Sequence, residues 1–405
     1  MLYNAYEMQK NWLAGASTLA NIGVEMLGNP RNPFAYFGGG EVLRSGLEVF
    51  AHASAPRGKP EFGLTHTVVD GAEVAVHEEI VLRQPFGQLK RFVKQGVEGA
   101  PKLLIVAPMS GHYATLLRGT VERMLPKHDV YITDWRDARQ VPLADGRFDL
   151  DDYIDYVIAF LEHIGPNTHV LAVCQPSVPV YAAVALMNAA DHPATPKTLT
   201  MMGGPVDTRA APTRVNTLAT ERPLSWFSSN VVTTVPYSYP GAGRRVYPGF
   251  MQLAGFMTMN LGNHLMSHYE MFKHLVAGED LQAEATKKFY EEYRSVCDMT
   301  AEFYLQTVQV VFQDHALPKG EMMHRDQRVD PAAITKTALL AIEGENDDIS
   351  GLGQTKAALD IAVNLPEAQK RYFMAPSVGH YGIFNGSKWR NTIAPVVEDW
   401  IAAHN

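Results

Sequence analysis

Three short segments contain the residue types needed for covalent catalysis. Cys174 follows the apolar run THVLAV, Asp347 follows TALLAIEG, and His380 follows QKRYFMA. A thiolate can attack a carbonyl carbon, a histidine can take up the thiol proton, and a carboxylate can orient that histidine. We therefore predict a catalytic triad in which Cys174 is the nucleophile, His380 the base and Asp347 the acid.

The segment around Cys174 has the pattern of a strand, a sharp turn and a helix. Such a turn lifts the side chain above the sheet, and the N-terminus of the following helix favours a thiolate. Pro176 occupies a position that is glycine in the G-x-S-x-G motif, although proline suits a first helical turn. The other cysteine, Cys297, lies in YRSVCDMTAEFYL, which we expect to be helical and to bury an inert thiol.

Three aspartates compete for the role of the acid in this triad. His380 lies between two glycines in a loop that lets its ring reach back over the sheet. Asp347 stands three residues after Gly344, whereas Asp348 and Asp207 are alternatives that could instead be solvated loop carboxylates. We favour Asp347, and we expect Asp348 to face the loop interior or solvent, where it could cap a helix beginning near Gly353.

The loop after the first strand of the repeat, residues 108–112, lies where an oxyanion hole takes one backbone N–H. We predict Met109 or Ser110 as that donor, and the N–H of Gln175 as the second donor. His112 is expected to line the substrate pocket or to hydrogen-bond within its loop, rather than to transfer protons.

Apolar runs and helical patterns alternate on both sides of a long irregular block. Strands are expected at 103–107, 129–133, 168–173, 198–202, 337–344 and 369–375. Helices are expected near 114–125, 154–161, 178–189, 354–363 and 389–401. Strand patterns at 65–69 and 72–81 suggest antiparallel edge strands. The order nucleophile, acid, base on this frame predicts an α/β-hydrolase fold, a doubly wound, mostly parallel sheet with an inserted cap domain.

Four segments follow from this pattern. Residues 1–60 form an N-terminal helical segment, 61–204 the first part of the core, 205–333 the cap, and 334–405 the second part of the core. The first helix, closed by Pro30, either packs on the body or lies on an apolar surface.

The cap is rich in aromatic and methionine side chains, which suit a flexible aliphatic ester. We predict that some of them bind substrate, above all Trp226, Tyr237, Tyr239, Tyr247 and Phe250. Others could add to a channel or form the core of the cap itself, namely Phe227, Met251, Phe256, Met257 and Met259.

Composition excludes several classes of protein. The 405 residues are 46% hydrophobic and 19% charged, as in a globular protein, and the net charge of −8 gives no reason to bind nucleic acid. The sequence contains no run of 18 apolar residues that would suggest a membrane span, and its first residues lack the cationic start of a signal peptide. The presence of only two cysteines fits a reducing compartment. A cytoplasmic enzyme without metal or organic cofactor is expected.

The same segments resemble the intracellular short-chain poly(3-hydroxybutyrate) depolymerases. The matching strings begin at MLY and continue through PMSGHYATLLR, VYITDW, VCQPSVPV, TMMGGPVD, GRRVYPGF, EGENDDISG and GHYGIF. The resemblance implies a triad of Cys174, Asp347 and His380, and a substrate of amorphous polyester in cytoplasmic granules. Coenzyme A is then a possible co-substrate in place of water.

Two other functions remain open. Polyhydroxyalkanoate synthases are more distantly similar, but the box around Cys174 lacks the glycines of G-x-C-x-G, and this chain is shorter. A granule-coating binding protein with a vestigial triad is the other alternative. Product length, endo or exo cleavage, and oligomeric state are left open.

Overall fold

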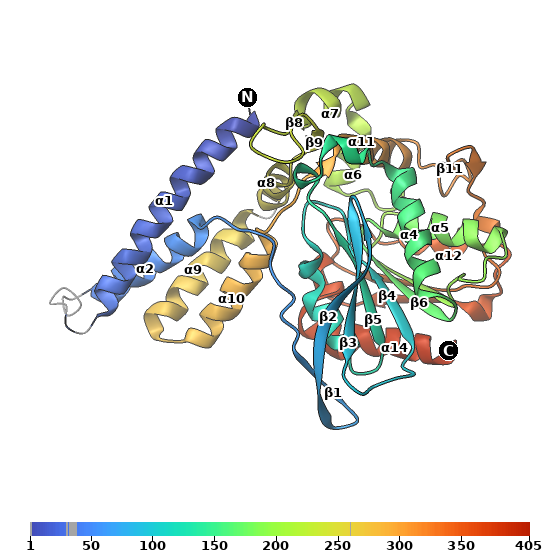
Figure 1. Cartoon of the computed structure of the whole chain (residues 1–405), viewed down its shortest axis with the longest axis horizontal. Coiled ribbons are helices and arrows are strands. Elements are labelled where there is room, and N and C mark those ends of the chain that lie inside the picture. The colour runs from blue at the N-terminus through green and yellow to red at the C-terminus, as the bar shows by residue number, and fades with distance from the viewer. Residues whose placement is uncertain (1, 30, 32–38, 260) are drawn as a thin grey trace.

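The computed structural model describes residues 2–29, 31, 39–259 and 261–405, without the side chains of Met259 and Asn263. Its centre is a nine-stranded sheet in the order β1-β2-β3-β5-β4-β6-β7-β13-β14 (Figure 1). The strands are β1 His66–Val69, β2 Ala72–Gln84, β3 Gly87–Lys94, β4 Lys102–Val106, β5 Asp129–Trp135, β6 Thr168–Val173, β7 Thr198–Met202, β13 Ala338–Gly344 and β14 Lys370–Ala375.

Strands β5, β4, β6, β7, β13 and β14 are parallel to one another, and their carboxyl ends share one edge. Strands β6, β7 and β13 are buried throughout, as expected for aliphatic runs covered by helices on both faces. This arrangement confirms the predicted α/β-hydrolase fold.

The antiparallel edge contains one strand more than predicted. Strands β1, β2 and β3 form a meander, and β3 pairs antiparallel with β5. The prediction missed β3 because Lys90 and Arg91 interrupt its apolar pattern. Lys90 instead bonds the carboxylate of Glu78 on β2, and Arg91 that of Asp129 on β5.

Helices cover the sheet in the expected places, with some differences in length. Helix α4 (Leu150–Ile164) begins with a capping box between Asp149 and Asp152, and α5 (Ser177–Ala189) packs against it. The predicted helix 114–125 is a 3₁₀ turn followed by α3 (Arg118–Met124). The helix predicted at 354–363 is only α12 (Ala357–Ile361), and the last one is a π turn at 389–393 followed by α14 (Ala394–Ala403).

The block between β7 and β13 divides into two groups of elements. One group packs on the body. Its helical elements are α6 Arg214–Glu221, α7 Leu224–Asn230, α11 Ala301–Thr307 and the π turn Val308–Gln313. Its strands form a small sheet of β8 Thr233–Thr234, β9 Arg245–Tyr247 and β10 Met299–Thr300, and a hairpin of β11 Met323–His324 and β12 Gln327–Arg328. The other group consists of α8 Gly249–Met259, α9 Leu261–Ala277 and α10 Asp280–Tyr293.

Helices α9 and α10 join the N-terminal helices α1 (Leu2–Gly28) and α2 (Gly40–Ser54). Figure 1 shows these four helices as a projection to the left of the α/β body, and we call them the helical arm. The described helices include none that is long and apolar enough to cross a membrane. Pro30, predicted to close the first helix, lies outside the described residues.

The segment around Cys297 is not helical, contrary to the prediction. Helix α10 ends at Tyr293, Val296 forms a β-bridge with His112, and the Cys297 N–H donates to the carbonyl of Gly111 at 2.8 Å. The chain is held extended here because it pairs with the loop after β4. The Cys297 thiol is buried, and that burial raises its pKa well above the usual range.

Candidate active site

Cys174 occupies a sharp turn between β6 and α5. Its φ of 66° is left-handed, a conformation that costs a residue with a side chain on the order of 1–3 kcal/mol. The turn is fixed on both sides, because the Cys174 N–H donates to Met202 O at 2.7 Å and the Ser177 N–H donates to Cys174 O at 3.0 Å. The side chain is partly exposed, at the carboxyl edge of the sheet. A strained strand-to-helix turn of this kind presents a nucleophile.

Two glycines after β7 leave room for this turn. A Cβ at Gly204 would lie 2.0 Å from Ser177 Oγ, so no side chain fits there. Gly203 has a φ of +60°, and a Cβ on it would lie 3.2 Å from Asp347 Oδ2 and 3.3 Å from His380 Cε1. In G-x-S-x-G sequences the glycines of the elbow itself make room for the turn. Here Gly203 and Gly204 after the neighbouring strand β7 make that room, so Pro176 is tolerated at the elbow.

Asp347 is the carboxylate that contacts the His380 ring. His380 Nδ1 and Asp347 Oδ2 are 2.8 Å apart, and both side chains are buried. The other oxygen of Asp347 accepts from the N–H groups of Ile349 at 2.9 Å and Ser350 at 2.8 Å. These bonds hold the carboxylate in place beneath the ring.

The two alternative acids lie elsewhere. Asp348 is exposed, and both oxygens of Asp207 bind the Arg209 guanidinium at 2.8 Å. The turn at 353–356 is capped by the carboxylate of Glu343, not by Asp348, through the N–H groups of Gly353, Thr355 and Lys356.

The charges around His380 favour its protonated form. Burial lowers the pKa of the imidazole, but the negative charges of Cys174 and Asp347 and hydrogen bonds to both side chains outweigh it and raise the pKa well above 6.5. The ring therefore links sulfur and carboxylate, and it can hold the thiol proton as an imidazolium.

The predicted oxyanion donors adjoin the elbow. The N–H of Met109 donates to the side-chain Oε1 of Gln175 at 3.2 Å, so a carbonyl oxygen already occupies this donor. The Nε2 of Gln175 is buried without a hydrogen-bond partner among the described residues. Ser110 is the next residue of the same loop and is more exposed than Met109.

His112 connects the body to the arm. Its Nε2 lies 2.9 Å from the carbonyl of Tyr293 at the end of α10, and its ring packs near those of Tyr293 and Phe256. Burial lowers its pKa to about 4, which keeps the imidazole neutral near pH 7. His112 thus joins the loop after β4 to the end of α10, beside the candidate active site.

The predicted substrate-binding aromatics contact other parts of the cap and the arm. Tyr239 and Phe250 pack around the ring of Tyr3 in α1, and Tyr247 stacks on Tyr304 at 4.0 Å. Trp226 packs edge-on against the neighbouring Phe227, and Tyr237 is 98% exposed. Their role in binding substrate stays a prediction.

Two tyrosines beside the triad were missed. The ring of Tyr381 lies 5.9 Å from that of His380 and 5.5 Å from that of Tyr293, with which it shares a hydrogen bond. Tyr381 follows the triad histidine directly in GHYGIF, which is a usable signal. Tyr293 has no such signal, because only the folding of the arm brings it there.

Comparisons with known proteins point to one family. A family model described as "PHB de-polymerase C-terminus" matches residues 203–405, which include Asp347 and His380. No curated protein matches the chain.

Solved structures with a similar fold include a monoacylglycerol lipase from Paleococcus ferrophilus, with 10% identity, a TM-score of 0.45 and coverage of 82% of this chain and 99% of that one. A thermophilic esterase from Thermogutta terrifontis has 12% identity, a TM-score of 0.40 and coverage of 84% and 98%. The match to the family model extends over half of the sequence. The chain therefore belongs to the PHB depolymerase family and is a hydrolase that acts on ester bonds.

Proposed function

We propose that the protein hydrolyses amorphous poly(3-hydroxybutyrate) in cytoplasmic granules through a cysteine acyl-enzyme. The observation that carries this proposal is the buried His380–Asp347 pair beside Cys174, whose charge interacts with the ring and whose backbone forms a strained elbow at the sheet edge. Membership of the PHB depolymerase family supports the choice of polyester.

Acylation begins when His380 takes the proton of Cys174. The sulfur attacks the ester carbonyl carbon of the polymer, and the carbonyl oxygen becomes an oxyanion held by the N–H groups of Gln175 and Met109. The Met109 N–H becomes available when the Gln175 side chain moves aside. The C–O ester bond then breaks, and His380 gives its proton to the departing 3-hydroxyl oxygen.

Deacylation restores the enzyme by the reverse proton movement. His380 takes a proton from water, the hydroxide oxygen attacks the thioester carbon, and the carboxylic acid leaves as the proton returns to sulfur. The thiol of coenzyme A can replace water as acyl acceptor, and the product is then an acyl-CoA. Asp347 holds Nδ1 of the ring throughout, so that Nε2 faces the sulfur.

Product analysis with amorphous granules tests this function. Wild-type protein should release soluble 3-hydroxybutyrate species, and Cys174→Ala should lose several orders of magnitude in rate while still binding granules. If the alanine variant kept about a tenth of the activity, Cys174 would not be the nucleophile.

The same assay distinguishes the competing functions. Adding coenzyme A separates hydrolysis from thiolysis, because only thiolysis yields acyl-CoA. Growth of polymer from 3-hydroxybutyryl-CoA would identify a synthase instead. Granule binding without turnover by the wild-type protein would identify a coat protein.

A further inference from the structure

The helical arm exposes most of the large apolar side chains that the described surface carries. On α1 alone, Met8 is 74%, Trp12 71% and Leu19 71% exposed. Further exposed side chains lie on the other three helices of the arm, among them Val42, Leu43, Phe50, Leu265, Met266, Tyr269 and Leu281. Soluble monomers rarely expose contiguous apolar patches this extensive, so the surface calls for an occupant.

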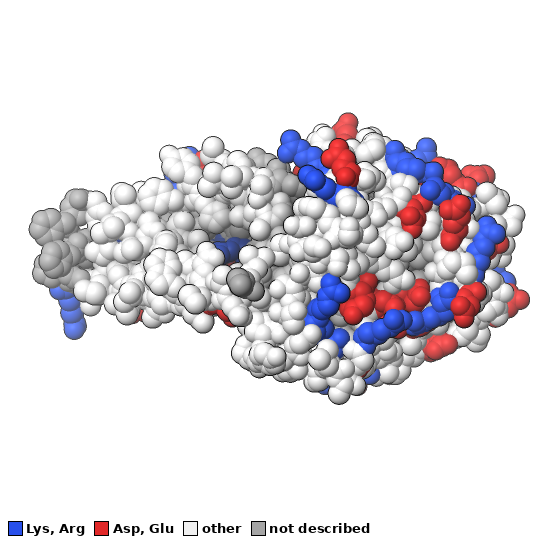
Figure 2. All heavy atoms as spheres, turned by 90° about the horizontal axis from the view of Figure 1, so that it is seen from above, with Lys and Arg blue, Asp and Glu red and all other residues white. Residues whose placement is uncertain are grey.

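The side of the arm that α1 forms carries little charge. Figure 2 shows the arm from the side of α1 as nearly free of Lys, Arg, Asp and Glu, whereas the body carries bands of both signs. The charged residues of α1 are Glu7, Lys10 and Glu25, and the first two lie one turn apart, 4.0 Å from each other. We call the exposed side of α1 the apolar face.

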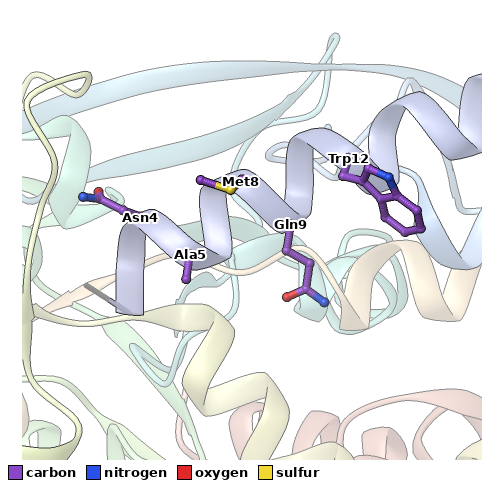
Figure 3. A pocket seen from close by; sticks show the side chains of 5 residues that line it. All are labelled: Asn4, Ala5, Met8, Gln9 and Trp12. Atoms are coloured by element: carbon purple, nitrogen blue, oxygen red, sulfur yellow. The ribbon is translucent and has the colours of Figure 1, made fainter.

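The apolar face contains an open hollow near the start of the chain. It is shallow and open to solvent, and Figure 3 shows the residues that line it along the first turns of α1: Asn4, Ala5, Met8, Gln9 and Trp12. Its walls are apolar except for the amides of Asn4 and Gln9. Such a hollow suits an aliphatic segment with hydrogen-bond acceptors, and no charged group is present to bind an ion.

The arm is fixed to the active site as well as exposed. At the end of α10, Tyr293 contacts Tyr381 beside the triad histidine, and its carbonyl binds His112. The preceding residue of the same helix, Glu292, forms an ion pair with Arg118 of the body at 2.7 Å. A surface that binds the arm therefore also keeps His380 and its neighbours close to that surface.

We propose that the apolar face is the surface by which the enzyme docks on amorphous polyester. The inference rests on the proposed function, which requires a water-soluble chain to act on an insoluble aliphatic ester phase. Protruding Met, Leu and Trp side chains can insert into a mobile polymer that offers no fixed shape for a complementary surface.

Two other occupants fit less well. An anionic bilayer attracts helices rich in Lys and Arg, and α1 contains one lysine. A second copy of the chain would need a self-complementary face of this helix, and the light-scattering measurement below tests that alternative.

Granule binding can be measured apart from turnover. Full-length Cys174→Ala protein is sedimented with amorphous poly(3-hydroxybutyrate) granules, with and without the added changes Met8→Lys, Trp12→Lys and Leu19→Lys. The arm variant should bind at least about tenfold more weakly, because even one large apolar side chain that becomes buried on docking contributes about tenfold in affinity.

A matched variant controls for added charge. Val68→Lys, Leu143→Lys and Val363→Lys place the same charges on exposed apolar positions of the body, outside the arm. This control should bind granules within about twofold of the parent, since three charges change bulk electrostatics equally in both variants. With Cys174 restored, hydrolysis of soluble p-nitrophenyl butyrate by the arm variant should match the wild type and show that its site is folded.

Three results would overturn the inference. The first is undiminished granule binding by the arm variant. The second is a wild-type dimer in light scattering that the arm variant converts to a monomer, which would make the apolar face an interface between copies. The third is binding to phosphatidylcholine vesicles as tight as binding to granules. Because the binding assay uses inactive protein, failure of the polymer hydrolysis assay would contradict the proposed function without deciding this test.

Discussion

At the scale of single residues, the orientation of His380 depends on one carboxylate. Asp347 holds Nδ1 of the ring, and two backbone N–H groups hold Asp347. Asp348 and Asp207 do not contact the His380 ring, although all three aspartates lie in loops after strands of the sheet. Replacing each of them should therefore affect catalysis to a different degree.

Replacing Asp347 by Asn should leave the fold intact and reduce kcat strongly. The amide favours the wrong tautomer of His380, a change that lowers kcat on the order of 10⁴ in serine triads. The loss should be smaller with a cysteine, which ionises more easily, but larger than for Asp348→Asn or Asp207→Asn. Steady-state kinetics on a soluble ester check this order, and a greater loss in Asp348→Asn would contradict it.

The Gln175 side chain should inhibit the oxyanion hole, because it occupies one of the two expected N–H donors. Gln175→Ala removes the Oε1 that binds Met109 N–H, so kcat/KM on a small ester should rise about two- to tenfold, the value of one hydrogen bond. Gln175→Glu is the matched control, since its carboxylate keeps the acceptor and should lower activity. A fall in kcat/KM for the alanine variant would show that the amide assists catalysis.

At the scale of elements, close packing of β7 against the elbow determines which residues are tolerated. Gly204→Ala should destabilise the protein by about 1–3 kcal/mol, as overpacking does, because its Cβ would lie 2.2 Å from Ser177 Cβ. Thermal unfolding measures the loss. Ser177→Gly should recover part of it in the double variant, whereas additive losses would show that the clash lies elsewhere.

The elements that sequence could predict are those with a local signal. Strands β6, β7 and β13 were predictable because they are buried aliphatic runs, and the pairing of His380 with Asp347 could be anticipated because both residues follow strands of the sheet. Strand β3 was missed because its lysine and arginine pair with neighbouring strands. The extended segment at Cys297 was missed because its partner, the loop at Gly111, is far away in sequence.

At the scale of the whole molecule, the arm is secured to the body by a buried polar cluster. Tyr3 donates to Asp298 Oδ2 at 2.6 Å, and Asp298 Oδ1 accepts from Gly249 at the start of α8. Arg139 binds Asp137, whose carboxylate adjoins Asp298. Sequence periodicity predicted the first helix and left open whether it packs on the body or lies on an apolar surface, but it gave no sign of this junction.

The stability of this junction should depend on pH. Burial and the neighbouring Asp137 raise the pKa of Asp298 to about 6, against 3.8 for the free side chain. A carboxyl whose folded pKa is raised stabilises the fold fully below pH 3.8, and that contribution is lost as pH rises through 6.

Asp298→Asn removes this titration and keeps an oxygen for Tyr3 to donate to. The melting temperature of the wild type minus that of Asp298→Asn should therefore fall as pH rises from 4.5 to about 7. Groups that lie away from Asp298 and titrate in both proteins cancel in this difference. A difference that is constant, or that grows with pH, would contradict the assignment.

The Tyr3 to Asp298 bond also dictates an order of events during synthesis. The two residues are separated by 295 positions, so the first turn of the chain emerges from the ribosome long before its acceptor exists. Helix α1 can pair early with α2 and can contact β8, but its bond to Asp298 must wait for α9, α10 and the segment after them. Until that segment has been made, the apolar helix lacks this attachment to the body, and its exposed side chains can meet other chains in the cell.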